Sequence, residues 1–367
     1  MNFANKVKKN QGHSIMKITK ATELKTIPEI SELRFGKHFT DHMFFSHYSV
    51  DKGWDEGEIT PYGPFQMDPA ASVFHYGQAL FEGIKAFLQK DGTIAVFRPE
   101  FNANRLREGA KRICLPEPPV ELFINGIKEL LKIDKRWMPA QKGNAMYIRP
   151  TLIGTEDFLG VRPSSKALFY TILSPVGRYY DTTSPSVKIW VEREDTRAAK
   201  GGLGAIKAGA NYAASLRASH NANLKGYSQV LWTDTSSDYV EEVGTMNVFF
   251  KVGDKIITPA LNGSILEGGT RGCCIQLLED AGYNVEQRAI SLKELHTYYS
   301  NGELKEIFGT GTAAVITPVD TLAFEDEEWT ISEGFGPTAE WLFNEISDIQ
   351  YGEKEDRFNW LVPLDKL

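Results

Sequence analysis

The chain has 367 residues, of which 42% are hydrophobic and 24% charged, a balance typical of a globular protein long enough for two domains. Its formal net charge of −7 and pI near 5.6 exclude the basic surface that a nucleic-acid binder needs. The three cysteines form no framework or Cys-x-x-Cys pair, and no apolar run is long enough to span a membrane. We expect a cytoplasmic protein that acts on small molecules.

In the first half of the chain, periodicity and turn residues predict a mixture of strands and helices. Residues 1–20 are rich in lysine and resemble a polar leader, within which Met16 is an alternative start. Strands are predicted at residues 93–97, 145–153 and 167–173, and amphipathic helices at residues 102–113 and 120–133. The polar stretch at 177–186 lacks any period, and we expect it to link a small N-terminal domain, 21–176, to a larger C-terminal domain, 187–367.

The second half continues the same alternation. Strands are predicted at residues 187–191, 229–232 and 245–252, helices at 211–224 and 270–281, and a strand, turn and strand at 306–318. This arrangement predicts an α+β (mixed α/β) fold with loops in which chemistry can be placed.

One lysine stands out in the second half. Lys207 lies in "GGLGAIKAGANYAAS", residues 201–215, between glycines and alanines. Loss of solvent around such a lysine lowers its pKa and makes the amine nucleophilic enough for a Schiff base. The alternative is an ordinary surface lysine in a loop, which spacing alone does not exclude.

Three other segments have the composition of a binding site. Either Glu241 or Glu242 in "VEEVGTMNVFFKV" could hold a pyridinium nitrogen in its charged form, although an exposed acid at a strand end is the simpler interpretation. The segments "LEGGTRG" (266–272) and "FGTGTAA" (308–314) place glycine and threonine where backbone amides can bind an anion. Each alone is also typical of an ordinary turn.

His38 and His42, in "HFTDH", have a spacing that could hold zinc on a helix. The surrounding sequence instead favours a strand, so we predict no metal site here.

Taken together, these segments resemble the fold type IV pyridoxal-phosphate enzymes, and among them the branched-chain amino acid aminotransferases. The resemblance runs from about residue 35 to residue 352 and includes, in the family's order, "HYGQALFEGIKAF", "FRPEFNANRL", "MYIRPTLIGTE", "KAGANYAAS", "EVGTMNVFF", "EGGTRG" and "FGTGTAA". It implies a two-domain fold with the cofactor cleft between the domains. It also implies ping-pong transamination of leucine, isoleucine and valine with 2-oxoglutarate.

The resemblance assigns roles to individual residues. Lys207 would be the Schiff-base lysine and proton carrier, Glu242 would face the pyridine nitrogen, and Tyr212 would hydrogen-bond the ring oxygen. The phosphate of pyridoxal 5'-phosphate would be held by Arg105, Gly269, Thr270 and Thr312. The substrate carboxylate would be bound by Tyr76, Thr245 and the amide of Ala313.

The same resemblance implies a substrate pocket and an assembly. Phe35, Phe81 and Tyr147 would form an apolar wall with Arg149 at its edge. Leu159 and Val161 would line the pocket of a partner subunit, which implies a homodimer. The preferred branched-chain substrate, a biosynthetic or catabolic role and any assembly above the dimer stay open.

Other functions explain fewer of these segments. D-amino-acid aminotransferases and the lyase that releases 4-aminobenzoate share the lysine and glutamate but lack the combination of "HYGQALFEGIKAF" and "MYIRPTLIG". A Schiff-base aldolase explains Lys207 but not two anion-binding turns, and a binding module without activity explains neither.

Overall fold

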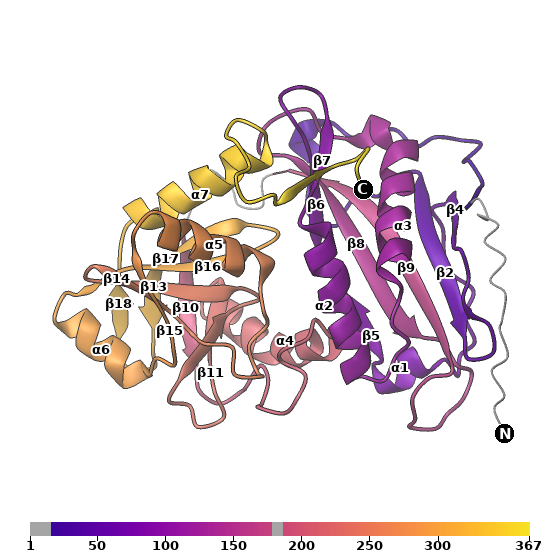
Figure 1. The fold of residues 1–367 in the computed structure, drawn as a ribbon. Coiled ribbons are helices and arrows are strands. Elements are labelled where there is room, and N and C mark those ends of the chain that lie inside the picture. Colours follow the sequence, from indigo (N-terminus) through magenta and orange to yellow (C-terminus); the bar gives the residue numbers. More distant parts are fainter. Residues whose placement is uncertain (1–15, 178–185) are drawn as a thin grey trace, which may run out of the picture.

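The computed structural model describes residues 16–177 and 186–367. Within these residues the chain forms two mixed sheets, one of ten strands and one of nine, that lie beside each other (Figure 1). Helices are distributed between both sheets, so the predicted α+β class is confirmed. The segment predicted as a linker falls almost entirely at residues 178–185, outside the described residues.

The first sheet is built mainly from the N-terminal half, in the order β1-β4-β2-β9-β8-β6-β7-β19, with β3 beside β2 and β5 beside β8. Its strands are β1 (Lys17–Ile18), β2 (His42–Ser49), β3 (Gly53–Trp54), β4 (Glu58–Pro61), β5 (Ala79–Phe81), β6 (Ile84–Leu88), β7 (Ile94–Phe97), β8 (Ala145–Gly154), β9 (Lys166–Val176) and β19 (Leu361–Pro363). The helices of this half are α1 (Ser72–Tyr76), α2 (Pro99–Arg112) and α3 (Val120–Ile133), with short 3-10 turns at Ile30–Glu32 and Lys135–Trp137.

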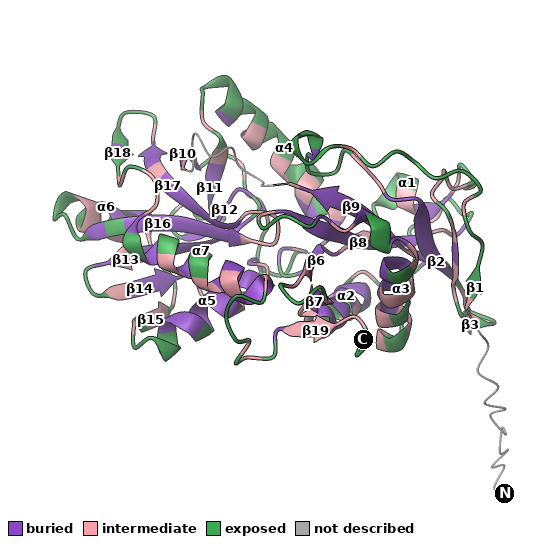
Figure 2. Cartoon of the chain, turned by 90° about the horizontal axis from the view of Figure 1, so that it is seen from above, coloured by how far each residue is buried: buried purple, intermediate pink, exposed green. Residues whose placement is uncertain are grey.

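Helices α2 and α3 lie together on one face of this sheet (Figure 2). The covered face carries Ile84, Ala86 and Ile148, which belong to the main core of this half. The opposite face carries Lys85, Phe87 and Tyr147, because successive side chains of a strand point to opposite sides. Polar and aromatic residues are therefore presented where the two sheets meet.

The second sheet follows the order β12-β11-β10-β17-β16-β13-β14-β15, with β18 beside β17. Its strands are β10 (Val187–Glu192), β11 (Gln229–Thr233), β12 (Val240–Val243), β13 (Asn247–Val252), β14 (Lys255–Thr258), β15 (Asn284–Gln287), β16 (Leu304–Gly311), β17 (Val315–Ala323) and β18 (Glu328–Thr330). The helices of this half are α4 (Gly209–Leu224), α5 (Gly269–Asp280), α6 (Leu292–Ser300) and α7 (Pro337–Gln350).

Most predicted elements are confirmed with small shifts at their ends. The helix predicted at 120–133 has these same bounds in α3. The helix predicted from residue 102 begins earlier, at Pro99, because proline suits the first position of a helix, where its missing N–H costs nothing. The strand predicted from residue 245 begins only at Asn247, because Gly244, with φ of 55°, turns the chain between β12 and β13.

Two ends of the chain differ from the predicted boundaries. Lys17 and Ile18, which we expected in the leader, pair with β4 at the edge of the first sheet. The strand β19, close to the C-terminus, pairs with β7 of the same sheet, although we assigned all of 187–367 to the second domain. Both pairings join strands that are far apart in the sequence, and such pairings leave no periodic pattern of hydrophobic residues in either strand.

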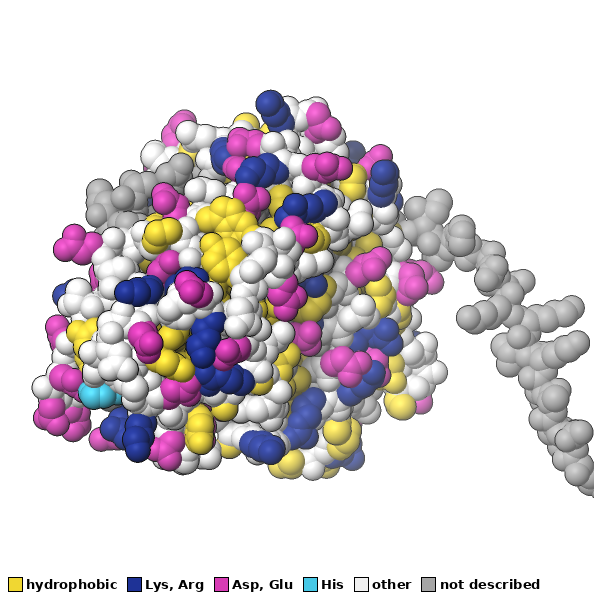
Figure 3. Space-filling model, turned by 60° about the vertical axis from the view of Figure 1, so that its left-hand side comes forward, with side chains coloured by type: hydrophobic (Ala, Val, Ile, Leu, Met, Phe, Trp, Pro, Cys, Tyr) yellow, Lys and Arg dark blue, Asp and Glu magenta, His cyan; other side chains and the backbone are white. Residues whose placement is uncertain are grey.

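The strands of both sheets are largely buried, and exposed residues gather on the outer sides of α3 and α4 and in the loops (Figure 2). Figure 3 shows that basic and acidic side chains alternate over the face of the second half without a large area of one sign. That face therefore offers no continuous positive track for a phosphate backbone. Within 16–177 and 186–367, no helix has the length and apolar character that a membrane span requires.

Candidate active site

A cavity of about 300 Å³ lies where the two sheets meet. Phe81, Tyr147 and Arg149 reach it from the first sheet, and Lys207 and Tyr212 reach it from the loop before α4 and from α4 itself. The remaining lining residues come from strand ends and turns of both halves: Phe35, Gly83, Gln229, Thr245, Met246, Gly311, Thr312, Ala313 and Ala314. Segments far apart in the sequence thus converge on the predicted lysine.

Lys207 is held from both sides of the cavity. Its carbonyl accepts a hydrogen bond of 3.1 Å from the amide of Phe81, and its Nζ donates to the hydroxyl of Tyr212 at 2.6 Å. Burial, assisted by the positive charge of Arg105, lowers the pKa of Lys207 to about 8. The surface-loop alternative is therefore wrong, because this amine is partly buried in a shared cavity and is close to its reactive form near neutral pH.

The glycine-rich loop before Lys207 packs tightly enough to require glycine at one position. A Cβ on Gly204 would lie 2.0 Å from the carbonyl oxygen of Ser264. Arg197, which is buried, donates to both carbonyls, at 3.0 Å to Gly204 and 2.5 Å to Ser264. The loop is therefore fixed to the second half before the chain reaches Lys207.

A small positively charged hollow adjoins the cavity, and we call it the cup. Arg105, Arg98 and Lys85 line it, together with the first residues of α5, Gly269 and Thr270. Arg105 is oriented by Glu82, whose two oxygens accept hydrogen bonds of 2.8 and 2.7 Å from Nε and Nη2. Cations and the amides at the start of a helix both favour an anion such as phosphate.

A third hollow, which we call the recess, contains Glu242. Its Oε1 accepts a hydrogen bond of 2.7 Å from the amide of Leu266 and lies 3.1 Å from Nη2 of Arg197. Burial raises the pKa of Glu242, whereas Arg197 and the Leu266 amide oppose this change. The neighbouring Glu241 instead accepts hydrogen bonds from Ser264 and Asn262, outside the recess.

The cup, the cavity and the recess adjoin one another. Gly83 and Thr312 line both the cup and the cavity, and Tyr212 and Thr245 line both the cavity and the recess. A flat ring that bears a phosphate at one end and a basic nitrogen at another would therefore meet cations at one end and a carboxylate at the other. Lys207 would lie beside its middle.

The wall of the cavity is aromatic, with one cation at its edge. The rings of Phe35 and Tyr147 are 4.8 Å apart in an edge-on arrangement. The guanidinium of Arg149 lies 4.7 Å from the centre of the Phe81 ring and donates to the hydroxyl of Tyr147 at 2.8 Å. This wall suits an aliphatic side chain and leaves one positive group within reach of a longer, acidic one.

Three residues assigned from the resemblance lie away from the cavity of their own chain. Tyr76 ends α1, and Leu159 and Val161 lie in the loop between β8 and β9, with exposed fractions of 39%, 65% and 86%. The two segments are neighbours, because the amide of Ser72 donates to the carbonyl of Glu156 at 3.1 Å. Tyr76 is not among the residues that line the cavity of its own chain, so its assignment to the substrate carboxylate stays a prediction.

The candidate histidine pair does not form a cluster. Nδ1 of His42 lies 2.7 Å from Oδ1 of Asp134, and its Nε2 accepts a hydrogen bond of 2.9 Å from the amide of Ala21. Both ring nitrogens thus have protein partners. Among the residues described here, no group of three His, Cys, Asp or Glu is arranged to hold a metal ion.

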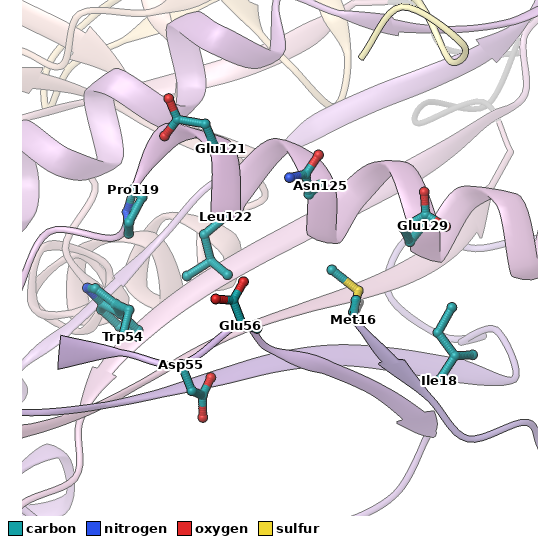
Figure 4. Close-up of a pocket in the computed structure, with 10 residues that line it drawn as sticks. All are labelled: Met16, Ile18, Trp54, Asp55, Glu56, Pro119, Glu121, Leu122, Asn125 and Glu129. Carbon is teal, nitrogen blue, oxygen red and sulfur yellow. The ribbon is translucent and has the colours of Figure 1, made fainter. Parts of the chain in front are cut away.

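Another groove, of about 550 Å³, lies on the far side of the first sheet, beside β1 and α3 (Figure 4). Its lining includes Asp55, Glu56, Glu121 and Glu129, and among its described lining residues there is no lysine or arginine. Four carboxylates would repel a phosphate group. This groove therefore does not compete with the cup as a site for an anionic ligand.

Residues 79–322 match the family model of class IV amino-transferases. The matched range contains Arg105, Lys207 and Glu242. The chain belongs to the class IV aminotransferase family. Among members of that family, it is 47% identical to a probable branched-chain-amino-acid aminotransferase of Staphylococcus epidermidis over 96% of this chain and 99% of the relative. It is 48% identical to branched-chain-amino-acid aminotransferase 2 of Bacillus subtilis, over 93% and 94% of the two chains.

Solved structures of class IV aminotransferases share the fold. The branched-chain amino acid aminotransferase of Escherichia coli superposes with a TM-score of 0.73 at 26% identity, over 88% of this chain and 99% of that one. The enzyme of Thermobaculum terrenum superposes with a TM-score of 0.72 at 25% identity, over 88% of this chain and 98% of that one. That second structure is of the PLP form, the holo-form of the enzyme.

Sequence reasoning missed several residues that this class IV aminotransferase brings to the site. Glu82 and Lys85 lie within the quoted "HYGQALFEGIKAF", but nothing in that segment indicates that they contact Arg105 and Ala313. Arg197 precedes the glycine-rich loop and resembles any charged loop residue. Gln229 and Met246 line the cavity from strand and turn positions that only the assembled sheet brings near Lys207.

Proposed function

We propose that this chain transfers the amino group of L-leucine, L-isoleucine and L-valine to 2-oxoglutarate, with pyridoxal 5'-phosphate as cofactor, to give branched-chain 2-oxo acids and L-glutamate. The observation that carries the proposal is the amine of Lys207, 2.6 Å from the Tyr212 hydroxyl, between a cationic cup and a carboxylate recess. The relatives named branched-chain-amino-acid aminotransferases support the substrate class.

The described residues fit the cofactor. Arg105 and Thr312, with the amides of Gly269 and Thr270 at the start of α5, would hold the phosphate. Tyr212 would donate to the ring oxygen, and burial raises the pKa of its hydroxyl to about 12, so it keeps its proton. Glu242 would hold the ring nitrogen in its charged form. When bound, the charged ring withdraws electrons from the Cα of the substrate.

Lys207 both attaches the cofactor and moves the proton. Its lowered pKa leaves a substantial fraction of uncharged amine at neutral pH, which the attachment requires. Once it is no longer attached to the cofactor, the same amine can accept the proton from the substrate Cα and deliver it to C4′ of the cofactor. Thr245 and the amide of Ala313, which line the cavity beside it, would bind the substrate carboxylate.

An amino-donor panel with 2-oxoglutarate as acceptor tests the proposal. We expect turnover with L-leucine, L-isoleucine and L-valine and at least tenfold lower kcat/KM with D-alanine, because the aromatic wall offers apolar contact to a branched side chain. A preference for D-alanine would instead support the D-amino-acid branch of the family. A protein without bound chromophore and without turnover would exclude both.

Arg149 is predicted to bind the distal carboxylate of glutamate. On β8 it lies two residues beyond Tyr147, so both side chains point to the cavity. Among the described residues its only hydrogen bond is to the Tyr147 hydroxyl, so its guanidinium is not committed to loop carbonyls. We expect Arg149→Ala to slow the glutamate half-reaction at least tenfold, about 1.4 kcal/mol, and to leave the leucine half-reaction within a few fold.

Single-turnover measurement of each half-reaction, followed through the cofactor absorbance, decides this prediction. Arg149→Lys is the matched control, because it keeps a positive charge and should retain part of the glutamate reaction. If the rates of the leucine and glutamate half-reactions fall equally, Arg149 supports the aromatic wall and does not bind the substrate carboxylate.

We also propose that the site is completed in a homodimer. Phe74, Tyr76, Phe158, Leu159 and Val161 are all exposed, and they lie on α1 and on the neighbouring loop between β8 and β9. Such a surface favours a partner, and a second copy would place these residues near its neighbour's cavity. Leu159→Asp is expected to weaken both dimerisation and kcat/KM, measured by sedimentation and by steady-state kinetics. A fully active monomer would contradict the proposal.

We infer a cytoplasmic location from the cysteines. Cys114, Cys273 and Cys274 are all free thiols, as is usual in a reducing compartment.

A further inference from the structure

One hydrogen bond crosses between the two sheets at the edge of the candidate active site. Nζ of Lys85, on β6, donates to the carbonyl oxygen of Ala313 at 2.7 Å. The two residues are 228 positions apart in the sequence, and Ala313 lies in the loop between β16 and β17. Within the described residues, this is the only hydrogen bond of the Lys85 ammonium.

The register of the first sheet explains why Lys85 points to this place. Lys85 pairs with Tyr147 across β6 and β8, so both side chains lie on the face that meets the second sheet. Its neighbours Ile84 and Ala86 point the other way, into the core beneath α2 and α3. The ammonium therefore lines the cup beside Arg105.

The loop that Lys85 contacts needs support. It contains only Thr312, Ala313 and Ala314, between the paired residues Gly311 and Val315. Val315 has a φ of 64°, which is unfavourable for a β-branched residue and persists only where the surroundings enforce it. Thr312 lines both the cup and the cavity, so a shift of this loop would disturb two binding positions together.

We infer that Lys85 is a positioning residue that holds the Thr312–Ala314 loop by its Ala313 carbonyl and so keeps the loop's amides directed at the anions of cofactor and substrate. The inference rests on the proposed function for the identity of these anions. Because a peptide is planar, fixing the Ala313 carbonyl also fixes the direction of the Ala314 amide, and Ala314 lines the cavity next to Ala313, whose own amide is assigned to the substrate carboxylate. Burial lowers the pKa of Lys85 to about 8, so at pH 7 the ammonium is still the main form and can donate this bond.

A positioning residue for anion-binding amides has a distinct kinetic effect. The amides bind the carboxylate in the ground state and in the transition state alike, so their misplacement raises KM and leaves kcat little changed. We expect Lys85→Met to raise KM for L-leucine and for 2-oxoglutarate at least tenfold and to change kcat less than threefold. Lys85→Arg, which retains a donor, should recover most of the loss.

Two measurements do not depend on turnover. Titration of the apoenzyme with pyridoxal phosphate and with inorganic phosphate should show several-fold weaker binding in Lys85→Met. Hydrogen exchange should accelerate at the amides of residues 312–314 and stay unchanged in β8 and β9. Lys90→Met, an exposed lysine just beyond β6, is the matched control and should behave like the wild type in every assay.

The outcomes separate this inference from the proposed function. Unchanged KM, phosphate affinity and loop exchange in Lys85→Met would overturn the positioning role, as would an equal fall in kcat that Lys85→Arg does not recover. If both Lys85→Met and Lys85→Gln lose the whole fold in thermal unfolding, Lys85 is a structural support and the positioning role is also wrong. The proposed function is tested separately by the wild-type amino-donor panel.

Discussion

Replacing Lys207 with alanine is expected to abolish transamination while the protein still binds pyridoxal phosphate through the cup. The cationic residues of the cup, Arg105 and Arg98, come from another part of the chain and are unaffected by the change. The amine, in contrast, has no substitute in the position 2.6 Å from the Tyr212 hydroxyl. Removal of a positioned proton carrier alone costs about 10²- to 10⁴-fold in rate, and loss of the attachment adds to it.

The measurement is single turnover with L-leucine, together with borohydride reduction of the loaded protein and mapping of the labelled peptide. The wild type should be labelled at Lys207, and the variant should not be labelled. Lys200→Ala is the matched control, because Lys200 is exposed in the same glycine-rich loop. Wild-type turnover in the Lys207 variant would rule out the assignment.

The lowered pKa of Lys207 also predicts a pH dependence. The uncharged amine is the form that attaches the cofactor, and its fraction rises as the pH passes through about 8. The rate at which the apoenzyme captures pyridoxal phosphate should therefore rise from pH 6, reach half of its maximum near pH 8 and level off above about pH 9. Stopped-flow absorbance would measure this rate, and a profile centred near pH 10 would show that the amine is not desolvated.

The second large effect is expected at Glu242. Glu242→Gln removes the charge that would hold the ring nitrogen protonated and should lower kcat by at least about 100-fold, or some 2.7 kcal/mol. Glu241→Gln is the matched control, because Glu241 is equally buried but contacts Ser264 and Asn262 outside the recess. The kcat of Glu241→Gln should stay within a few fold of the wild-type value.

Steady-state kcat and the absorption spectrum of the bound cofactor would distinguish the two variants. Thermal unfolding should accompany them, because both carboxylates are buried and either change can alter stability. If both variants lose kcat equally at the same stability, the assignment of Glu242 as the carboxylate that faces the ring is wrong.

Much of the local structure was predictable from the sequence, because it depends on near neighbours. Period and polarity located α3 at 120–133, and Pro99 sets the start of α2 for reasons of backbone geometry alone. The glycine and alanine residues around Lys207 indicated a desolvated amine, and the structure agrees, with a pKa lowered to about 8. Composition and charge also excluded a nucleic-acid binder.

The tertiary structure alone decided which residues meet. The residues around Glu241 and Glu242 left the choice between them open, since both are buried in β12, and only the packing of Leu266 and Arg197 distinguishes the recess. The pairing of Arg105 with Glu82, the bond from Lys85 to Ala313 and the return of β19 to the first sheet join residues that are distant in the chain. Hydrophobic periodicity in the sequence indicates which face of a helix or strand is buried. The contacts named above depend instead on how separate segments pack together, and no local sequence pattern contains that information.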